Sequence, residues 1–341
     1  MKRPTQTDVA RLAGVSRATV SYVLNGQANG RVPISQETRR RVLEAASQLG
    51  YEPDARAQSL RSGATRTIGL LIPDLHNPHF WQIVGGVMDA ARAAGYDLLL
   101  SSSDLKREQE EMSLKSLARR RIDGLILLVS FTALTEAQLE EMAARRLPIV
   151  MIGCKGLAFD CIGSNYSDSG KVVMDHLLGL GHRRIGFIHG VATQRLAEDR
   201  LHSYVEGLAE AGLPFDEELI EHCGPSMEEG YNAAVRLLSR TPRPTAIIAI
   251  NDLLALGAQR AAADLGLRIP DDLSLVGYDD VFCSSYLTPR LTTVHMDAET
   301  IGSGAVTLLL ERLQDPDAPH KSVELPTRLM IRESTSVAPA D

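Results

Sequence analysis

From Thr67 onward, the sequence alternates short, unbroken apolar runs with longer stretches of helical periodicity. The runs that we take as strands are 68–72, 97–100, 124–129, 149–152, 185–188, 246–250 and 273–276, and the helical stretches include 79–94, 106–120, 135–146, 168–180, 227–239 and 252–265. Apolar strands that alternate with helices indicate parallel sheets covered on both faces. About 270 residues of this pattern exceed one usual domain, so the sequence predicts two doubly wound α/β lobes around a cleft.

A short N-terminal segment combines two helical patterns with turn chemistry between them. Thr7 is a candidate N-cap of the first helix, and Ser16 is a candidate N-cap of the second, which we expect over 17–24. Between them, Gly14 can adopt the left-handed conformation of a tight turn, and Val15 can fill the angle between the helices. This pattern predicts a helix-turn-helix, whose second helix enters the major groove of DNA.

A third helix is expected from Ser35 to Leu49, with Gly50 at its end. The apolar positions that we expect to face inward across the three helices are Val9, Ala10, Leu12, Ala13, Val20, Val23, Leu24, Val42, Leu43, Ala46 and Leu49. The outer face of the second helix is expected to carry Arg17, Ala18, Ser21 and Tyr22. The alternative is a small three-helix bundle with solvated arginines.

Charge is divided unevenly along the chain. The formal net charge is −7, but residues 1–61 contain ten Lys and Arg against five Asp and Glu, which leaves 26 basic against 38 acidic residues in the remainder. A basic head on an acidic body is expected where one end meets nucleic-acid phosphate and the other stays off it.

The segment 53–61 has good helix formers but lacks an apolar face, and at nine residues it is too short to be stable alone. We therefore predict a hinge helix and linker over 53–66 that orders only when something packs on it. A plain linker remains the alternative. The expected domains are a helix-turn-helix head over 1–52, this hinge, and a two-lobed body over 67–341.

Several strings resemble the LacI/GalR (lactose-repressor) family of bacterial transcriptional regulators. In the head they are TDVARLAGVS (7–16), TVS (19–21), VLN (23–25) and LGY (49–51) followed by Pro53. In the body they are IPD (72–74), NPHF (77–80), LGHRRI (180–185), Arg200 with Tyr204, ND (251–252), GYDD (277–280) and LTTV (291–294). The resemblance covers essentially the entire chain and implies a body of the periplasmic-binding-protein type.

The resemblance implies a set of DNA-contacting residues. They are Thr5, Ser16, Arg17, Ala18, Thr19, Ser21, Tyr22, Asn25, Tyr51, Ala57 and Leu60. Arg17, Ala18 and Tyr22 match base-reading positions, although Arg is commoner than Tyr at the last. Leu60 matches a hinge leucine that wedges between base pairs in the minor groove, with Ala57 on the same helix face.

The resemblance also implies an effector site made of His79, Phe80, Asn165, Arg200, Asn251 and Asp279. The fork of Arg200 suits a carboxylate or paired hydroxyls, and Asp279 suits hydroxyls or ring N–H groups. We expect these two on opposite sides of the cleft, although singly each could be a structural ion-pair residue. Gly153 and Ser164 replace acceptors common in sugar-binding members, which favours a sugar derivative or carboxylate over a common hexose.

The implied assembly is a homodimer on a palindromic operator in double-stranded DNA, with a tetramer left open. The expected regulation is a small metabolite that changes the angle between the lobes. Induction is the expectation on family grounds, with co-repression as the alternative.

Other function classes lack their motifs. No Gly-x-Gly-x-x-Gly follows the run 68–72, and the chain has no Gly-x-Ser-x-Gly, Walker loop or His-Glu-x-x-His, so we expect no catalysis, cofactor or metal. The cysteines, which have no Cys-x-x-Cys spacing, are expected to be reduced thiols: Cys154, Cys161, Cys223 and Cys283. With no signal segment or membrane-length apolar run, we expect a cytoplasmic protein rather than a transport-associated binding protein.

Overall fold

The computed structural model describes residues 4–24, 34–51, 64–128, 147–153, 159–190 and 195–339. They belong to two compact units, Met1–Thr65 and Arg66–Asp341. The expected fold class, an all-α head and an α/β body with two parallel-sheet lobes, is confirmed. The helical stretch expected over 135–146 lies outside the described residues.

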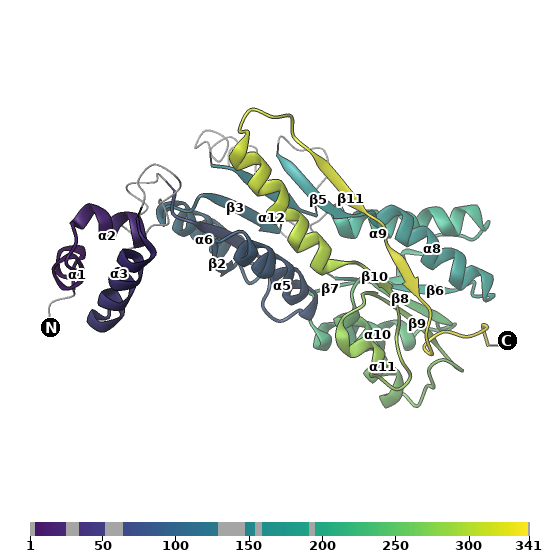
Figure 1. Ribbon diagram of the computed structural model, residues 1–341. Coiled ribbons are helices and arrows are strands. Elements are labelled where there is room, and N and C mark those ends of the chain that lie inside the picture. Colours follow the sequence, from purple (N-terminus) through teal and green to yellow (C-terminus); the bar gives the residue numbers. More distant parts are fainter. Residues whose placement is uncertain are drawn as a thin grey trace. The chain divides into compact units, whose positions relative to one another are not determined.

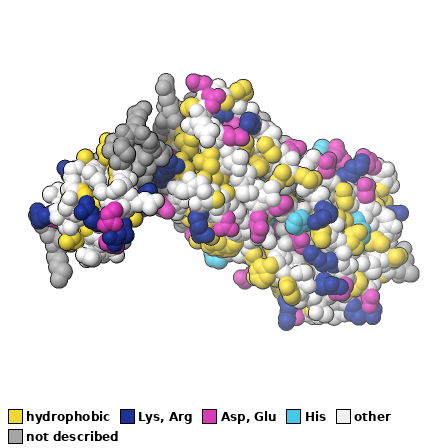
Figure 2. All heavy atoms as spheres, viewed as in Figure 1, with side chains coloured by type: hydrophobic (Ala, Val, Ile, Leu, Met, Phe, Trp, Pro, Cys, Tyr) yellow, Lys and Arg dark blue, Asp and Glu magenta, His cyan; other side chains and the backbone are white. Residues whose placement is uncertain are grey.

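The described part of the first unit contains α1 (Gln6–Ala13), α2 (Arg17–Leu24) and α3 (Gln36–Leu49) (Figure 1). Val9, Val20 and Val42, one from each helix, are fully buried and form the centre of its core. Lys and Arg side chains stand out on the visible surface of this unit (Figure 2). The core is small, and the basic side chains stay in solvent.

The helix caps of this unit follow the expected chemistry at all but one position. Thr5, not Thr7, caps α1, because its hydroxyl accepts from the Asp8 amide while the Asp8 carboxylate accepts the Thr5 N–H at 3.0 Å. Thr7 therefore lies inside the first turn. Gly14 adopts the left-handed conformation at φ 64°, and the Ser16 hydroxyl accepts from the backbone N–H of α2 as expected.

Two inward-facing expectations are wrong. Leu12 and Leu43 are each about half exposed, at 50% and 49%. The buried positions of α3 are Val42, Ala45 and Ala46, and the buried positions of α1 include two alanines. These small side chains allow close approach of the helices, so the larger leucines lie at the rim.

Within the described residues, the second unit contains two six-stranded sheets. Sheet A has the order β11-β5-β4-β3-β1-β2, with all neighbours parallel. Its strands are β1 (Thr67–Ile72), β2 (Asp97–Ser102), β3 (Gly124–Leu128), β4 (Ile149–Ile152), β5 (Asp160–Ser164) and β11 (Ser322–Leu325). Sheet B has the order β12-β10-β9-β8-β6-β7, and only β12 runs antiparallel to its neighbour among the described strands. Its strands are β6 (Ile185–Gly190), β7 (Ile220–Cys223), β8 (Ala246–Ala249), β9 (Ser274–Asp279), β10 (Thr292–His295) and β12 (Arg328–Met330).

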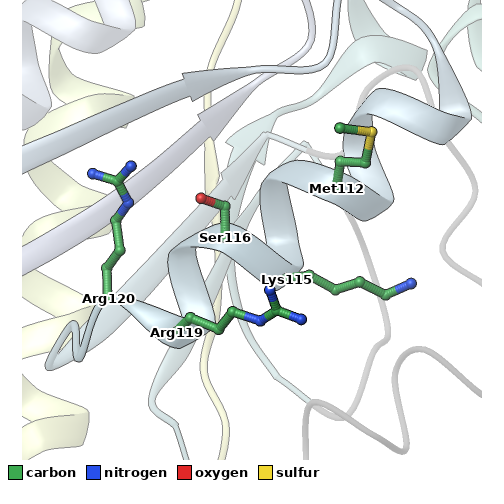
Figure 3. Close-up of a pocket in the computed structure, with 5 residues that line it drawn as sticks. All are labelled: Met112, Lys115, Ser116, Arg119 and Arg120. Atoms are coloured by element: carbon green, nitrogen blue, oxygen red, sulfur yellow. The ribbon is translucent and has the colours of Figure 1, made fainter.

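Helices cover both faces of each sheet (Figure 1). On sheet A, α5 (Pro78–Ala93) and α12 (Ala298–Gln314) pack on one face, and α6 (Arg107–Arg119) packs on the other and carries the pocket of Figure 3. On sheet B, the helices are α8 (Tyr166–Gly179), α9 (Arg195–Glu210), α10 (Met227–Leu238) and α11 (Asp252–Asp264). Two short 3₁₀ helices, η1 (Glu217–Leu219) and η2 (Phe282–Ser285), lie in the described loops of this lobe.

Each lobe contains a helix pair in which glycines lie against the backbone of the partner helix. A Cβ at Gly86 or Gly302 would lie 2.1 or 2.2 Å from a backbone oxygen of the partner helix in the pair α5 and α12. At Gly230 and Gly257, in the pair α10 and α11, the corresponding distances are 2.5 and 2.0 Å. A side chain at any of these positions would push the helices apart.

Within the described ranges, the chain passes between the lobes three times. It leaves sheet A after β5 to form α8, returns from β10 to α12, and crosses again between β11 and β12. Each lobe is therefore assembled from separate stretches of sequence.

Candidate functional site

The outer face of α2 carries the side chains expected to read DNA bases. Arg17, Ala18 and Tyr22 are exposed, while Val20 and Val23 of the same helix are buried. Helical periodicity separates the two sets, because residues three and four apart share a face. The first unit thus presents a short helix with an exposed outer face and a buried apolar face.

The polar residues around this helix are already engaged in local structure. The Ser16 and Thr19 hydroxyls lie 2.9 Å apart at the N-terminus of α2, and the Thr5 hydroxyl donates to Asp8 at 2.7 Å. Ser21 is half-buried, and Tyr51 is half-buried against the core of the unit. The expected contacts at Asn25, Ala57 and Leu60 lie outside the described residues.

In the second unit, three asparagines cap the helices that follow strands. The side-chain oxygens of Asn77, Asn165 and Asn251 accept from backbone N–H groups at the starts of α5, α8 and α11, at 3.0, 3.2 and 2.8 Å. Each asparagine directly follows a strand end or its loop, so these amides lie at the carboxyl edges of the sheets. Ligands of open α/β sheets bind at this edge.

The carboxyl edges of the two sheets meet at Asn77 and Asp279. The Asn77 amide donates to the Asp279 carboxylate at 3.5 Å, a long contact across the lobes. His79 lies in the first turn of α5 and is buried. Burial lowers the pKa of His79, Asp279 opposes the shift and Arg200 adds to it, so the imidazole is neutral. The charges of Asp279 and Arg200 therefore both act on the His79 imidazole.

Arg200 and Asp279 belong to the same lobe, not to opposite sides as expected. Arg200 is on α9, where its Nη1 donates to the Ile250 oxygen at 2.9 Å and its guanidinium lies 4.6 Å from the centre of the Tyr278 ring. Asp279 ends β9. Both elements pack around sheet B because the chain has already crossed between the lobes before α8.

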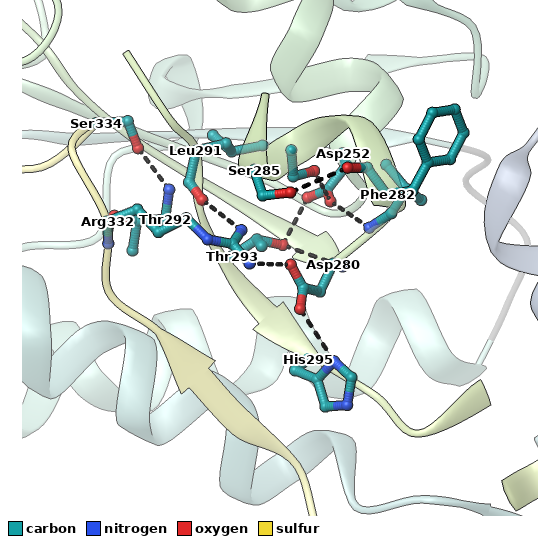
Figure 4. Close-up of polar contacts among 12 residues, drawn as sticks. Asp252, Asp280, Phe282, Ser285, Leu291, Thr292, Thr293, His295, Arg332 and Ser334 are labelled. Atoms are coloured by element: carbon teal, nitrogen blue, oxygen red, sulfur yellow. Dashed lines mark hydrogen bonds and ion pairs between the residues drawn. The ribbon is translucent and has the colours of Figure 1, made fainter. Parts of the chain in front are cut away.

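Two polar networks hold the backbone around Asp279. Asp279 and Asp280 have φ angles of 102° and 50°, in a region that is strained for residues with side chains. The Asp280 carboxylate binds Arg332 at 2.5 Å and His295 at 3.0 Å (Figure 4). These partners fix the turn that aims Asp279 toward the other lobe.

The second network centres on Asp252, which is fully buried. Its carboxylate accepts from the Ser284 and Thr293 hydroxyls at 2.5 and 2.6 Å and from the Val281 N–H at 3.0 Å. Burial, with a further contribution from the charge of Asp279, raises the pKa of Asp252 to about 8. Asp252 is thus a structural support beneath the edge.

Two buried polar atoms at the edge of sheet A have no hydrogen-bond partner among the described residues. They are Nδ1 of His79 and Oγ of Ser164, in residues that are 6% and 2% exposed. Ser164 ends β5 and precedes Asn165. From sequence, Ser164 was interpreted only as the replacement of a hydroxyl acceptor, and it was not predicted to belong to the site. Its position directly before Asn165, a helix-capping residue, is the local signal that could have identified it.

The Phe80 ring is buried in the core and does not present an exposed face on which a ligand could stack. It belongs to the hydrophobic cluster of sheet A and is 4% exposed, with its ring centre 5.7 Å from that of His79. Its packing against His79 helps to hold the imidazole in place. A contact between Phe80 and a ligand stays a prediction.

The described residues add three findings on other site classes. None of their helices is long and apolar enough to cross a membrane. They contain no group of three or more His, Cys, Asp or Glu side chains that could hold a metal ion. Cys161 is buried, and Cys223 and Cys283 are free thiols. Burial raises the pKa of Cys223 to about 12, so that thiol stays protonated. Cys154 lies outside the described residues.

Comparisons with known proteins agree with this two-part organisation. Residues 5–54 match the family described as bacterial regulatory proteins, lacI family, and residues 174–335 match the periplasmic binding protein-like domain. The chain is 34% identical over 332 residues to the HTH-type transcriptional repressor PurR of Mannheimia succiniciproducens, covering 97% of this chain and 98% of the relative. It is 35% identical over 340 residues to PurR of Edwardsiella ictaluri, covering 98% of each.

Two solved structures are similar to the chain over almost its whole length. The lac repressor dimer bound to operator and the anti-inducer ONPF has a TM-score of 0.87 at 30% identity, covering 98% of this chain and 100% of that one. The complex of the transcriptional regulator CelR with cellobiose has a TM-score of 0.72 at 30% identity, covering 97% and 100%.

Proposed function

The chain belongs to the lacI family of bacterial regulatory proteins, and from this premise we propose that a small metabolite binds at the facing edges of sheets A and B and controls operator binding. The chain is a DNA-binding transcriptional repressor with an effector-binding C-terminal domain, not an enzyme. What the proposal adds is the place of the effector and the residues that hold it.

The two unpartnered atoms at the edge of sheet A carry this proposal. An unsatisfied buried polar group costs about 1–3 kcal/mol, so His79 Nδ1 and Ser164 Oγ favour a ligand that supplies their hydrogen bonds. Asn165 and Asn251 flank the same region as helix caps. A ligand there contacts both lobes and so responds to the angle between them.

The charged residues suggest the chemistry of the ligand. Arg200 offers a guanidinium already oriented by Ile250 and Tyr278, and Asp279 offers an acceptor held by its strained turn. A sugar derivative or a small carboxylate with ring N–H or hydroxyl groups fits this pair. CelR binds cellobiose in its solved complex, which supports an effector of sugar-like size in this fold.

For the first unit, we propose that α2 enters the major groove, where Arg17, Ala18 and Tyr22 contact base edges. Residues proposed to lie near the DNA backbone are Thr5, Ser16, Thr19, Ser21, Asn25 and Tyr51. The solved lac repressor dimer bound to operator supports a homodimer on operator DNA. We propose that the operator is palindromic, because a two-fold dimer reads two related half-sites, and that the protein is cytoplasmic. Induction is the proposed direction of regulation.

A ligand screen tests the effector site. The full chain is heated with a panel of metabolites, each stabilising compound is titrated against the promoter DNA beside the gene, and Arg200→Ala is compared with Arg260→Ala. Arg260 is an exposed residue of the same lobe, paired with Asp264 at 2.7 Å. We expect Arg200→Ala to abolish the response to the metabolite and to leave basal DNA binding intact, and Arg260→Ala to change neither.

Two results would count against parts of this proposal. Stabilisation by glucose, galactose or fructose at micromolar concentration would contradict the preference inferred from Gly153 and Ser164. A chain that binds DNA but responds to no metabolite of any class would instead use its second unit as a dimerisation scaffold.

A further inference from the structure

The C-terminal half of α6 and the turn after it carry four exposed basic residues, which we call the α6 basic patch. They are Lys115, Arg119, Arg120 and Arg121. None of them has an ion pair or a side-chain hydrogen bond to another described residue. Several exposed arginines elsewhere in the second unit are paired, for example Arg92 with Asp89 and Arg260 with Asp264.

The patch lies at the amino edge of sheet A, opposite the edge that carries the proposed effector site. The Arg66 N–H donates to the Asp123 carboxylate at 2.8 Å, and the Asp123 N–H donates to the Thr67 oxygen at 2.8 Å. The turn that contains Arg121 is therefore bonded to the place where the chain enters this unit from the helical head. Asp97 begins β2 and Asp123 precedes β3, so these acidic residues lie at the same edge.

A pocket of about 410 Å³ opens between the side chains of the patch. Its lining is Met112, Lys115, Ser116, Arg119 and Arg120. Figure 3 shows Lys115 and Arg119 extending in one direction from α6, and Arg120, just after the helix, extending away from them. Cations spread along an open surface suit a series of phosphates better than a single enclosed ligand.

The remainder of the body makes this cluster unusual. Beyond residue 61 the chain has 26 basic against 38 acidic residues, so a run of arginines without acidic partners among the described residues opposes the general charge of the unit. Such a site attracts a polyanion through long-range electrostatics.

Chain length sets an upper limit on the distance between the head and the start of the second unit. About 15 residues separate Tyr51 of the head from Arg66, and a fully extended chain of that length spans about 50 Å at most. We propose that the α6 basic patch contacts the phosphate backbone of the duplex beside the site read by the head. The contact rests on the DNA-binding function, and it adds affinity without reading sequence.

The test measures how the affinity of the full-length protein for a long duplex of random sequence depends on salt. Each phosphate contact contributes about −0.9 to the slope of log K against log salt on B-DNA. We expect the triple variant Arg119→Gln, Arg120→Gln, Arg121→Gln to have a shallower slope, by about 0.9 for every phosphate that the patch no longer neutralises. We also expect this variant to bind DNA more weakly than the wild type at low salt.

Two matched variants separate the contact from other effects. The triple replacement of the same arginines by lysine keeps the charge and is expected to keep the slope. The triple variant Lys171→Gln, Arg260→Gln, Arg268→Gln makes the same change in net charge on exposed residues of the other lobe and is expected to leave the slope unchanged. Thermal unfolding of each variant identifies any loss of folding.

Three outcomes overturn the proposal. The first is equal slopes for the wild type and the glutamine triple variant of the patch. The second is inorganic phosphate that stabilises the wild type but not this variant while their DNA slopes are equal, which assigns the pocket to a small anion. The third is a wild-type chain that does not bind DNA at all, which overturns the DNA-binding function as well and is thereby distinguished from the first two.

Discussion

Replacing Ser164 with alanine should make the ligand-free protein more stable, which is the reverse of the usual effect of changing a buried residue. Ser164 is 2% exposed, and its hydroxyl has no hydrogen-bond partner among the described residues. Alanine removes only that oxygen, so the packing of β5 against its neighbours is kept.

The expected gain follows from the cost of burying a polar group without a partner. That cost is about 1–3 kcal/mol, and the small space left by the oxygen offsets part of the gain. We expect an increase of about 1 kcal/mol in the free energy of unfolding, or about 2–4 °C in Tm for a unit of this size. In the presence of an effector, the same variant should bind more weakly because it lacks the hydroxyl.

Ser274→Ala is the matched control. Ser274 is also a fully buried strand serine, but its hydroxyl lies 2.9 Å from Nε2 of His182 and 3.3 Å from the Ser336 oxygen. We expect this control to lose about 1–3 kcal/mol, because the partners of the hydroxyl stay buried. Both variants are measured by urea unfolding and by thermal unfolding without ligand. A loss of stability in Ser164→Ala would refute the reasoning, since it would mean that the hydroxyl already has a partner such as ordered water.

Three other changes test the fold and the DNA-reading surface. Arg312→Ala should cost about 3–5 kcal/mol in urea unfolding at pH 7, because the buried Asp160 carboxylate loses its cation. Burial alone would raise the pKa of Asp160, but the hydrogen bonds from Arg312 and the Lys321 N–H outweigh burial, and the folded pKa is lower than the unfolded one. This stabilisation is therefore present above the pKa of the unfolded carboxyl and is lost as pH falls through the folded pKa. The stability of the variant should approach that of the wild type over the same fall in pH. Gly257→Ala should cost about 1–3 kcal/mol by pushing α10 from α11, whereas Gly179→Ala, whose Cβ would meet nothing within 4 Å, should not destabilise. Arg17→Ala should reduce discrimination between operator variants by about 1–3 kcal/mol in competition binding, and unchanged discrimination would contradict its base-reading role.

The central strands could be predicted from sequence because both of their faces are buried. All five positions of β3 are buried, as are the last five of β1, so each appears as an apolar run. The strands β5, β7, β10, β11 and β12 were missed. In β5, Asp160 interrupts the run, and its partner Arg312 lies 152 residues away, so no local pattern reveals that the carboxylate is satisfied.

The candidate site also contains features that local sequence predicts and features that it does not. The asparagine before Pro78 is a local cap signal, and the caps at Asn165 and Asn251 are equally local. The approach of Asn77 to Asp279 depends on 202 residues of intervening chain. The prediction that Arg200 and Asp279 lie on opposite sides of the cleft was wrong. Apolar periodicity predicts that a segment is a helix, but it does not show which sheet the helix covers after the chain crosses between lobes.

The glycine contact between α5 and α12 has a consequence for synthesis on the ribosome. Gly86 emerges early, but Gly302, which fills the space against it, follows on the order of 200 residues later. At about 5–20 residues per second, the apolar face of α5 waits tens of seconds for its cover. During that interval the nascent chain exposes an apolar helix face that chaperones can hold. A nonsense codon before β11 therefore leaves both lobes without their last strands, so we expect no truncated product to fold as a working fragment of the repressor.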